Sequence, residues 1–197
     1  MTVETSTRFS PLAEWQHTLA QLPTGLRVRE LPFLTQLTLR VEPGSPAAKA
    51  VEAALALTLP GPLRAEMSGD VKALWMGPDE WLLVAPEGRR HDLLAQLRAA
   101  VADEFATVTD VSAQRTTLAL SGHLVRTVLA QGCAIDLDPR VTPVGSCLTT
   151  VLAQAPITLV VRDEAASGVW LLVRSSFASY LATWLVDACT EYRGDTG

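Results

Sequence analysis

The sequence predicts an α+β fold of two related halves, in which a mostly antiparallel sheet carries its helices on one side. Three observations support this prediction. Alternating threonine and leucine at 35–39 return at 116–120, 81 residues later. The tetrapeptide Trp-Leu-Leu-Val at 81–84 returns at 170–173, 89 residues later. An alanine- and leucine-rich helical pattern follows each of these segments, so both halves read as pseudo-duplicated β-α-β-β-α units.

The chain length fits one domain of two half-repeats. With 197 residues it can bury roughly 70% of the surface that the unfolded chain exposes, so it needs no disulfide or metal to fold. We expect flexible ends at 1–7 and 193–197 around a single domain at 8–192. The half-repeats are expected at about 27–105 and 106–190.

Serine-proline pairs predict two helix starts in the first half, because serine is favoured at the N-cap and proline at the next position. The first pair is Ser10-Pro11, and the second is Ser45-Pro46, which precedes an apolar stripe of helical period. Between them, residues 28–41 predict one or two strands interrupted at Pro32. Residues 63–70 are expected to form a loop or an edge strand.

A hairpin and a helix complete the first half. The strands at 73–76 and 81–84 flank Gly77-Pro78-Asp79-Glu80, whose central proline and aspartate suit a type I turn. A helix with leucines facing inward follows at about 93–101. In the second half we expect strands at 108–110, 115–120, 146–153, 157–161 and 169–173. Helices are expected at 122–131, with Gly132 as the C-cap, and after Ser175 or Ser176, one of which is expected to cap the last helix.

Composition excludes several classes of protein. A net charge of −5 argues against a nucleic-acid-binding surface, which needs clustered positive charge. No apolar run is long enough for a membrane span, and the first residues do not resemble a signal peptide. Three cysteines without metal-type spacing suggest a reducing compartment, so we expect a cytoplasmic protein. The 19% of charged residues is low, which fits either surface covered by a partner or an alanine-rich genome.

Most residues with reactive side chains have simpler structural interpretations. No two glycines are separated by one residue, so the dinucleotide fingerprint is absent. His17, His91 and His123 lie in no metal or nucleophile motif. Cys133 is interpreted as a small buried side chain rather than a reactive thiol. Asp136 and Asp138 stand before a proline, as in a turn, although paired carboxylates can also serve acid–base chemistry.

Asp110 is the one ligand candidate. It stands between Val108-Thr109 and Val111-Ser112, so a charge interrupts apolar strands. Such a carboxylate needs partners, and the backbone amides of the next turn or Arg115 are the expected ones. A structural cap is the favoured interpretation, and ligand binding is the alternative.

Several segments in order resemble the gamma subunit of heterotetrameric sarcosine oxidase. They are the segments 10–12, 29–36, 75–83, 110–115, 118–122, 128–140 and 175–188, and the resemblance spans about residues 8 to 192. That family is related to the folate-binding fold of the glycine-cleavage aminomethyltransferase. Relative to many members of that fold, the chain has Ala113-Gln114 in place of His-Arg or His-Met and lacks the later domains.

The resemblance implies a role in a complex. In that family the alpha and beta subunits carry FAD, FMN and NAD, the delta subunit holds zinc, and tetrahydrofolate accepts the released one-carbon unit. The complex demethylates sarcosine to glycine, producing hydrogen peroxide and either formaldehyde or methylenetetrahydrofolate. The resemblance assigns the gamma subunit no catalytic, cofactor-binding or metal residue, and predicts alpha, beta and delta subunits as partners.

Two other functions remain open on the sequence. A stand-alone folate-binding one-carbon transfer protein would use Asp110 near the pterin. A regulatory module that binds an amino acid is the third hypothesis. An assembly subunit is the reading that the resemblance favours.

Overall fold

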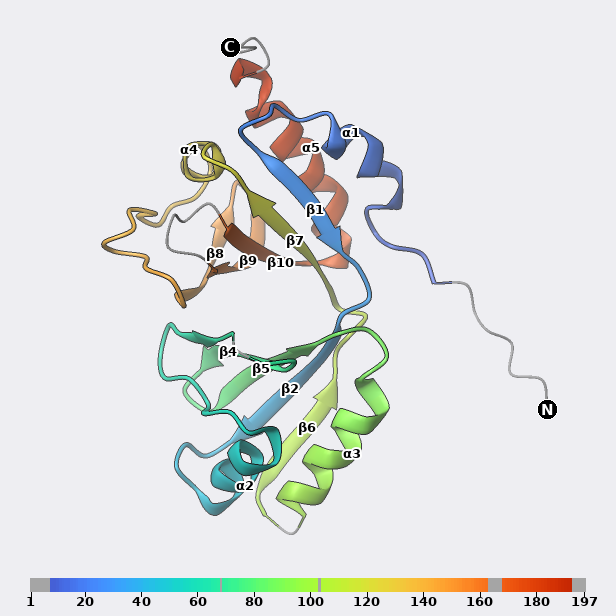
Figure 1. The fold of residues 1–197 in the computed structure, drawn as a ribbon, viewed down its shortest axis with the longest axis vertical. Coiled ribbons are helices and arrows are strands. Elements are labelled where there is room, and N and C mark those ends of the chain that lie inside the picture. Colours follow the sequence, from blue (N-terminus) through green and yellow to red (C-terminus); the bar gives the residue numbers. More distant parts are fainter. Residues whose placement is uncertain (1–7, 68, 103, 163–167, 193–197) are drawn as a thin grey trace, which may run out of the picture.

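The computed structural model describes residues 8–67, 69–102, 104–162 and 168–192, and it shows two antiparallel sheets of five strands each (Figure 1). The first sheet has the order β1 (Arg27–Leu31), β7 (Arg115–Ser121), β10 (Gly168–Arg174), β9 (Ala155–Val161) and β8 (Cys147–Leu152). The second has the order β3 (Ala65–Glu66), β4 (Lys72–Gly77), β5 (Glu80–Ala85), β2 (Thr35–Val41) and β6 (Ala106–Asp110). The predicted α+β class with antiparallel sheets is confirmed, although the sequence analysis did not foresee two separate sheets.

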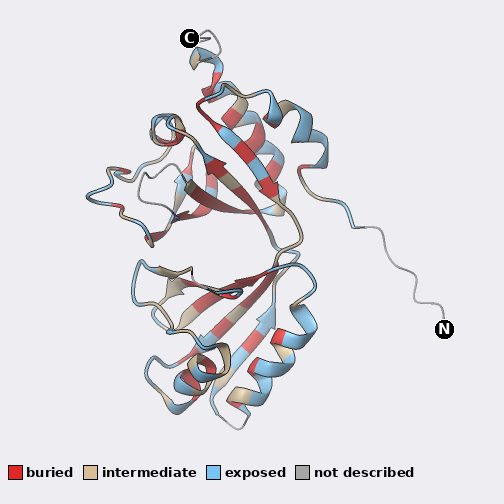
Figure 2. Cartoon of the chain, in the orientation of Figure 1, coloured by how far each residue is buried: buried red, intermediate tan, exposed pale blue. Residues whose placement is uncertain are grey.

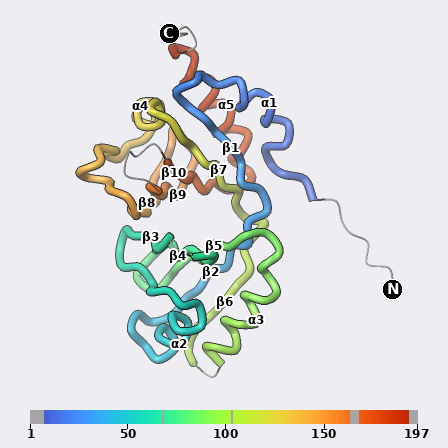
Figure 3. The backbone as a smooth tube through the Cα atoms, viewed as in Figure 1, coloured from blue at the N-terminus to red at the C-terminus, as the bar shows by residue number. Residues whose placement is uncertain are grey.

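Each half of the chain gives its first strand to the sheet of the other half. Strand β1 pairs with β7, and β6 pairs with β2. The connections β1–β2 and β6–β7 therefore cross between the sheets side by side (Figure 3). Gln36 ties them together, because its carbonyl accepts from the Val111 amide at 2.9 Å and its Nε2 donates to the Arg115 carbonyl at 3.2 Å. The two sheets are thus joined by exchanged strands.

The helices cover the outer face of each sheet. On the first sheet lie α1 (Gln16–Ala20), α4 (Val125–Ala130) and α5 (Ala178–Ala188), and on the second lie α2 (Pro46–Leu55) and α3 (Arg90–Val101). The predicted start of α2 is confirmed, since Ser45 Oγ accepts from the Ala48 amide at 3.1 Å and Pro46 opens the helix. The prediction of helices on one side holds for each sheet.

Three apolar clusters form the core, and Figure 2 shows the burial concentrated in the strands. Two clusters lie between a sheet and its helices. The third lies between the helix-free faces of the sheets, where buried residues of the two sheets meet: Leu74, Leu82, Val84, Cys147, Val160, Trp170 and Leu172. The layers therefore run helix, sheet, sheet, helix.

The repeated Trp-Leu-Leu-Val does not occupy equivalent positions. Leu37 pairs with Leu83 in the second sheet, and its counterpart Leu118 pairs with Leu171 in the first. The structurally equivalent residues 83 and 171 are therefore 88 apart, whereas the two copies of the tetrapeptide are 89 apart in the sequence. A shift of one residue reverses the face of a strand. Trp81 accordingly packs under the helices, whereas Trp170 faces the other sheet.

Some predicted boundaries were wrong. The segment after Ser10-Pro11 begins as a 3-10 turn at Ala13–Trp15, followed by α1. Helix α4 begins at Val125 instead of Gly122. Gly132 is not its C-cap, which is Gln131. A β-carbon at Gly132 would lie 2.5 Å from the Trp184 ring, so close packing is what this glycine provides.

Other boundaries agree with the sequence analysis. The strand break at Pro32 is present, and β3 at Ala65–Glu66 is the expected edge strand. The exception is the final helix, for which the predicted serine cap was wrong: a 3-10 turn at Ser175–Phe177 precedes α5, whose N-cap is Phe177 and which has no side-chain cap. The ends 1–7 and 193–197, expected to be flexible, lie outside the described residues. The half-repeat boundary near residue 105 stays a prediction.

Candidate functional site

A groove of about 700 Å³ lies beside the crossing of the two connections. The N-terminal segment before α1, the β1–β2 connection, the start of α3 and the loop after β6 all contribute to its walls. Its polar and charged lining residues are Arg8, Thr35, Arg90, His91, Asp110, Ser112, Arg115 and Ser175. The groove therefore brings the ligand candidate Asp110 together with residues from distant parts of the chain.

Asp110 ends strand β6 and is held by the turn that follows. Its Oδ1 accepts from the Ser112 amide at 3.0 Å and from the Ser112 hydroxyl at 2.6 Å. Its Oδ2 lies 3.4 Å from the Arg90 guanidinium. Backbone amides of the next turn were the expected partners, and the structure has them. This geometry fits the structural-cap interpretation.

Arg115 is not the partner of Asp110, contrary to the sequence-based alternative. The charged partner is Arg90 at the start of α3. Arg115 is half-buried, and within the described part of the chain no carboxylate forms an ion pair with it. Burial, together with the nearby Arg174 charge, lowers the pKa of Arg115. The groove thus contains one guanidinium without an ionic partner.

The pKa of Asp110 is lowered from its ordinary value. Partial burial raises the pKa, but the two hydrogen bonds from Ser112 and the charge of Arg90 outweigh that effect. The carboxylate therefore stays ionised at neutral pH. It can accept hydrogen bonds or balance a positive charge, but it does not hold a proton to donate near pH 7.

An equivalent acid lies at the other crossing. Glu30 of β1 pairs with Leu118, as Asp110 of β6 pairs with Leu37, so the two acids occupy matching positions. Glu30 is 8% exposed, and its carboxylate accepts from the Thr116 hydroxyl at 2.5 Å. The Ser10 hydroxyl donates to the same carboxylate. In both halves, an acid near the end of the exchanged strand accepts hydrogen bonds from neighbouring residues, which favours a structural role for Asp110.

The part of the groove formed by the β1–β2 connection contains an unusual backbone conformation. Phe33, in the β1–β2 connection, has a φ of 58°, a left-handed conformation that few bulky residues adopt. The Arg8 guanidinium stacks over its ring at 4.3 Å from the centroid and also contacts Glu87 at 3.0 Å. These contacts attach the N-terminal segment to the groove.

The histidines are scattered. His17 lies exposed on α1, 3.0 Å from Gln21. His91 lines the groove with its ring against Arg90 at 3.0 Å. His123 precedes α4, and its ring lies where a β-carbon on Gly25 would be. The structure does not bring the three together.

Cys133 is only partly buried, so the interpretation as a buried side chain was too strong.

The turn predicted at Asp136 and Asp138 is confirmed. Asp136 accepts from the Asp138 amide at 2.8 Å, and Asp138 accepts from the Arg140 amide at 2.8 Å. The Arg140 side chain lowers the pKa of Asp138 by direct hydrogen bonding. Asp138 therefore stays ionised at neutral pH.

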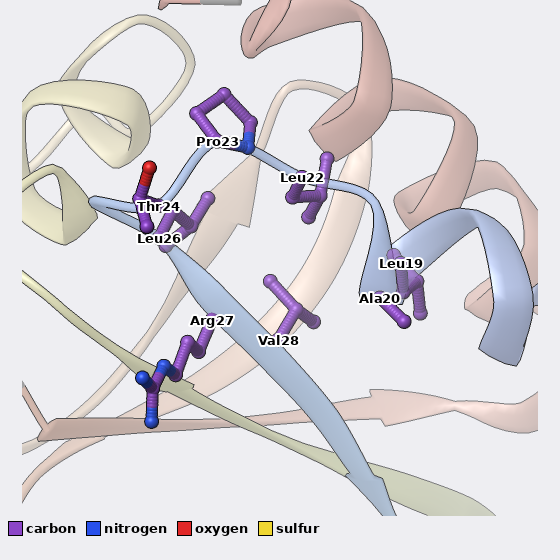
Figure 4. A pocket seen from close by; sticks show the side chains of 8 residues that line it. All are labelled: Leu19, Ala20, Leu22, Pro23, Thr24, Leu26, Arg27 and Val28. Atoms are coloured by element: carbon purple, nitrogen blue, oxygen red, sulfur yellow. The ribbon is translucent and has the colours of Figure 1, made fainter. Parts of the chain in front are cut away.

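A smaller hollow of about 340 Å³ lies between α1 and the start of β1, lined mainly by Leu19, Leu22, Leu26 and Val28 (Figure 4). Across the described ranges, no three His, Cys, Asp or Glu side chains converge as metal ligands. No described helix has the length and apolar character to cross a membrane.

Sequence reasoning missed Arg90 and Phe33. Arg90 appeared only as part of a helix start, and twenty residues separate it from Asp110, so no local pattern marks the pair. The left-handed Phe33 follows Pro32 but carries none of the glycine or asparagine signals of that conformation. Both features arise from the crossing of the two connections, which is a tertiary feature.

Comparison with solved structures relates the fold to that of an aminomethyltransferase. The glycine cleavage system aminomethyltransferase T from Bartonella henselae matches with a TM-score of 0.65 at 15% identity, covering 88% of this chain and 48% of that one. At this level of identity the match shows the fold alone. It agrees with the folate-binding-like fold expected from the sequence.

A second group of relatives matches over nearly the whole chain. A sarcosine oxidase subunit gamma from Corynebacterium sp. (strain P-1) is 38% identical over 97% of this chain and 94% of its own length. One chain of the heterotetrameric sarcosine oxidase from Corynebacterium sp. U-96 in complex with pyrrole 2-carboxylate matches with a TM-score of 0.87 and 36% identity, covering 96% and 98% of the two chains. The family model of the sarcosine oxidase gamma subunit matches residues 40–191. The chain therefore belongs to the sarcosine oxidase gamma subunit family.

Proposed function

We propose that this chain is a non-catalytic assembly subunit of a heterotetrameric sarcosine oxidase, with alpha, beta and delta subunits as its partners. The complex would demethylate sarcosine oxidatively to glycine, with hydrogen peroxide and formaldehyde or 5,10-methylenetetrahydrofolate as the other products. The observation that carries the proposal is the match to a chain of the solved heterotetramer, which covers 98% of that chain at a TM-score of 0.87. The resemblance thus extends over a complete subunit of the complex.

The site geometry supports a role outside the chemistry. The Asp110 carboxylate in the groove of about 700 Å³ is held ionised by Ser112 and Arg90, so it is not available as a general acid. We place FAD, FMN, NAD, zinc and tetrahydrofolate in the partner subunits. We also place the complex in the cytoplasm, where the three free cysteines would remain reduced.

Co-expression tests this proposal. The alpha, beta and delta chains are produced with and without this chain, and the assembled mass, flavin absorbance and sarcosine-dependent peroxide production are measured. We expect this chain to co-purify in a flavin-containing complex and its omission to lower the yield of intact complex. A complex that forms equally well without it would refute an assembly role, and sarcosine turnover by the chain alone would refute a non-catalytic one.

The alternative of folate binding rests on the groove around Asp110. Titration of the isolated chain with 5-formyltetrahydrofolate, followed by tryptophan fluorescence, tests it directly. Saturable binding that Asp110→Asn abolishes would support the alternative. Absence of binding, or binding unchanged in the variant, would remove it.

A further inference from the structure

A second hollow, of about 510 Å³, lies on the helix-free face of the first sheet. Two rows of cross-strand neighbours form it. Arg29, Ala119 and Trp170 stand side by side on β1, β7 and β10, and Arg27, Ser121 and Gly168 form the next row. Arg162 follows β9, and its amide donates to the Gly168 carbonyl at 2.8 Å. We call Arg27, Arg29, Arg162, Ser121 and Trp170 the arginine cradle.

The register explains why this face is hollow. Residues two apart on a strand share a face, and adjacent strands lie about 4.8 Å apart. The middle of the cradle is occupied by alanine, serine and glycine, whereas long side chains stand at its edges. Arg27 borders this hollow as well as the smaller one, and its side chain leaves β1 on the side away from Leu22 and Pro23 (Figure 4). The result is a shallow depression with positive charge around it.

Among the described residues, the three arginines have no acidic partner. Arg27, Arg29 and Arg162 are all exposed, and none of the ion pairs among the described residues involves them. Arg162 stacks on Trp170 at 4.4 Å from the ring centroid. The net charge of the chain is −5, so this group of unpaired arginines forms a positive region on a protein that is negative as a whole. Neighbouring positive charges on a surface repel one another, and a bound anion offsets this repulsion.

Trp170 supplies an independent observation. The residue is 6% exposed, and its indole Nε1 is a buried donor with no acceptor in the described part of the structure. Buried donors are normally paired, so an orphaned one calls for an explanation. Trp81 on the other sheet donates from its Nε1 to the Pro60 carbonyl at 2.9 Å. The chain can therefore satisfy a buried indole but leaves this one open beside the cradle.

The matching place on the second sheet is electrically balanced. By strand register, Arg40 is the counterpart of Ser121, and Thr107 and Thr109 are the counterparts of Arg27 and Arg29. Arg40 contacts both oxygens of Asp79, at 2.9 and 3.0 Å. The fold itself thus does not require unpaired arginines at this position.

From these features we propose that the arginine cradle is the docking surface for an acidic segment of a partner subunit, one that presents at least two carboxylates. Arginine binds carboxylates in paired geometry, which suits it to interfaces. The backbones of Arg27 and Arg162 are three strand spacings apart, about 14 Å. A chain segment that presents two carboxylates can span that distance and reach both ends of the cradle. This inference rests on the proposed function, because it names where that assembly is made.

Binding of the co-expressed partner subunits tests the cradle. The affinity of the full chain for the remaining complex is measured at about 50 mM and about 500 mM NaCl, because the Debye length shortens to a few ångströms at the higher salt. The test variant combines Arg27→Gln, Arg29→Gln and Arg162→Gln.

A matched control combines three substitutions of exposed cations outside the cradle, namely Lys49→Gln, Arg64→Gln and Arg98→Gln, and so removes the same charge. We expect the test variant to bind about tenfold or more weakly at low salt and to lose most of the salt dependence. The control should bind like wild type. Unchanged thermal unfolding midpoints of both isolated variants establish that folding is intact.

Several results would overturn the proposal while leaving the proposed function in place. One is equal binding by the test and control variants. Another is full competition by citrate: if citrate, at matched ionic strength, displaces the partner subunits from the wild-type chain, the site binds a small anion. A third is self-association of the wild-type chain that the test variant abolishes. If the wild-type chain binds no partner subunit at all, the proposed function fails as well.

Discussion

Gly122 sets the distance between the segment before β1 and the start of α4, and replacing it tests this packing. Its φ is +115°, outside the range that side chains tolerate. A β-carbon there would stand 2.1 Å from the Gly25 carbonyl oxygen, which is backbone and cannot rotate away. The same oxygen accepts from the Leu124 amide at 3.0 Å. Gly122→Ala therefore strains its own backbone and displaces a hydrogen-bonded neighbour.

The expected loss of unfolding free energy is large for one methyl group. The backbone strain costs about 1–3 kcal/mol, and the broken hydrogen bond adds about 1 kcal/mol. Displacement of packed groups adds about 1–3 kcal/mol. Together these predict a loss of about 3–7 kcal/mol. For a chain of this size that corresponds to at least about 6 °C in Tm.

Gly44→Ala is the matched control. Gly44 has a φ of +73°, and nothing lies within 4 Å of the position where its β-carbon would be. This variant suffers the backbone cost alone, about 1 kcal/mol. Urea unfolding followed by circular dichroism measures both variants. A difference of less than about 0.5 kcal/mol between them would refute the reasoning that close approach of two backbones makes Gly122 necessary.

Three further predictions follow from charge and burial. Asp110→Asn should lower stability by about 1 kcal/mol at pH 7. Because the folded pKa is depressed, the difference is complete above about pH 5, begins to shrink below about pH 4 and is lost as pH falls through the lowered pKa of the folded state, as urea titrations at several pH values would reveal. Burial raises the pKa of Cys147 to about 12, so a thiol reagent at about pH 8 should label Cys133 first, as peptide mapping would detect. Trp81→Phe should destabilise the chain by about 1 kcal/mol more than Trp170→Phe, since only Trp81 loses a hydrogen bond; equal urea midpoints would contradict this.

Local signals in the sequence were reliable where the chemistry is local. Ser45-Pro46 predicted the start of α2 because capping involves only neighbouring residues. Pro32 marked the break between β1 and β2, since proline removes a donor from the sheet. The turn at Asp136 and Asp138 followed from the same kind of short-range bonding. The family resemblance added the fold relationship.

Register and pairing were beyond the reach of local signals. The repeated Trp-Leu-Leu-Val suggested equivalent positions, yet the strands align one residue apart, so Trp81 and Trp170 face opposite sides. Only the hydrogen-bonded neighbours of a strand define its register, and these lie far away in the sequence. The site showed the same limit, because Asp110 pairs with Arg90 rather than with the nearby Arg115.

The sequence alone therefore determined the fold class, the order of most elements and the family; it also singled out Asp110, whose role as a ligand residue stays a prediction. Tertiary structure alone decided the exchange of β1 and β6 between the two sheets, because strand exchange depends on contacts that span most of the chain. It also decided the arginine cradle. Arg27 and Arg29 share a strand face and are visible as a pair in the sequence, but Arg162 joins them only when β9 lies in the same sheet.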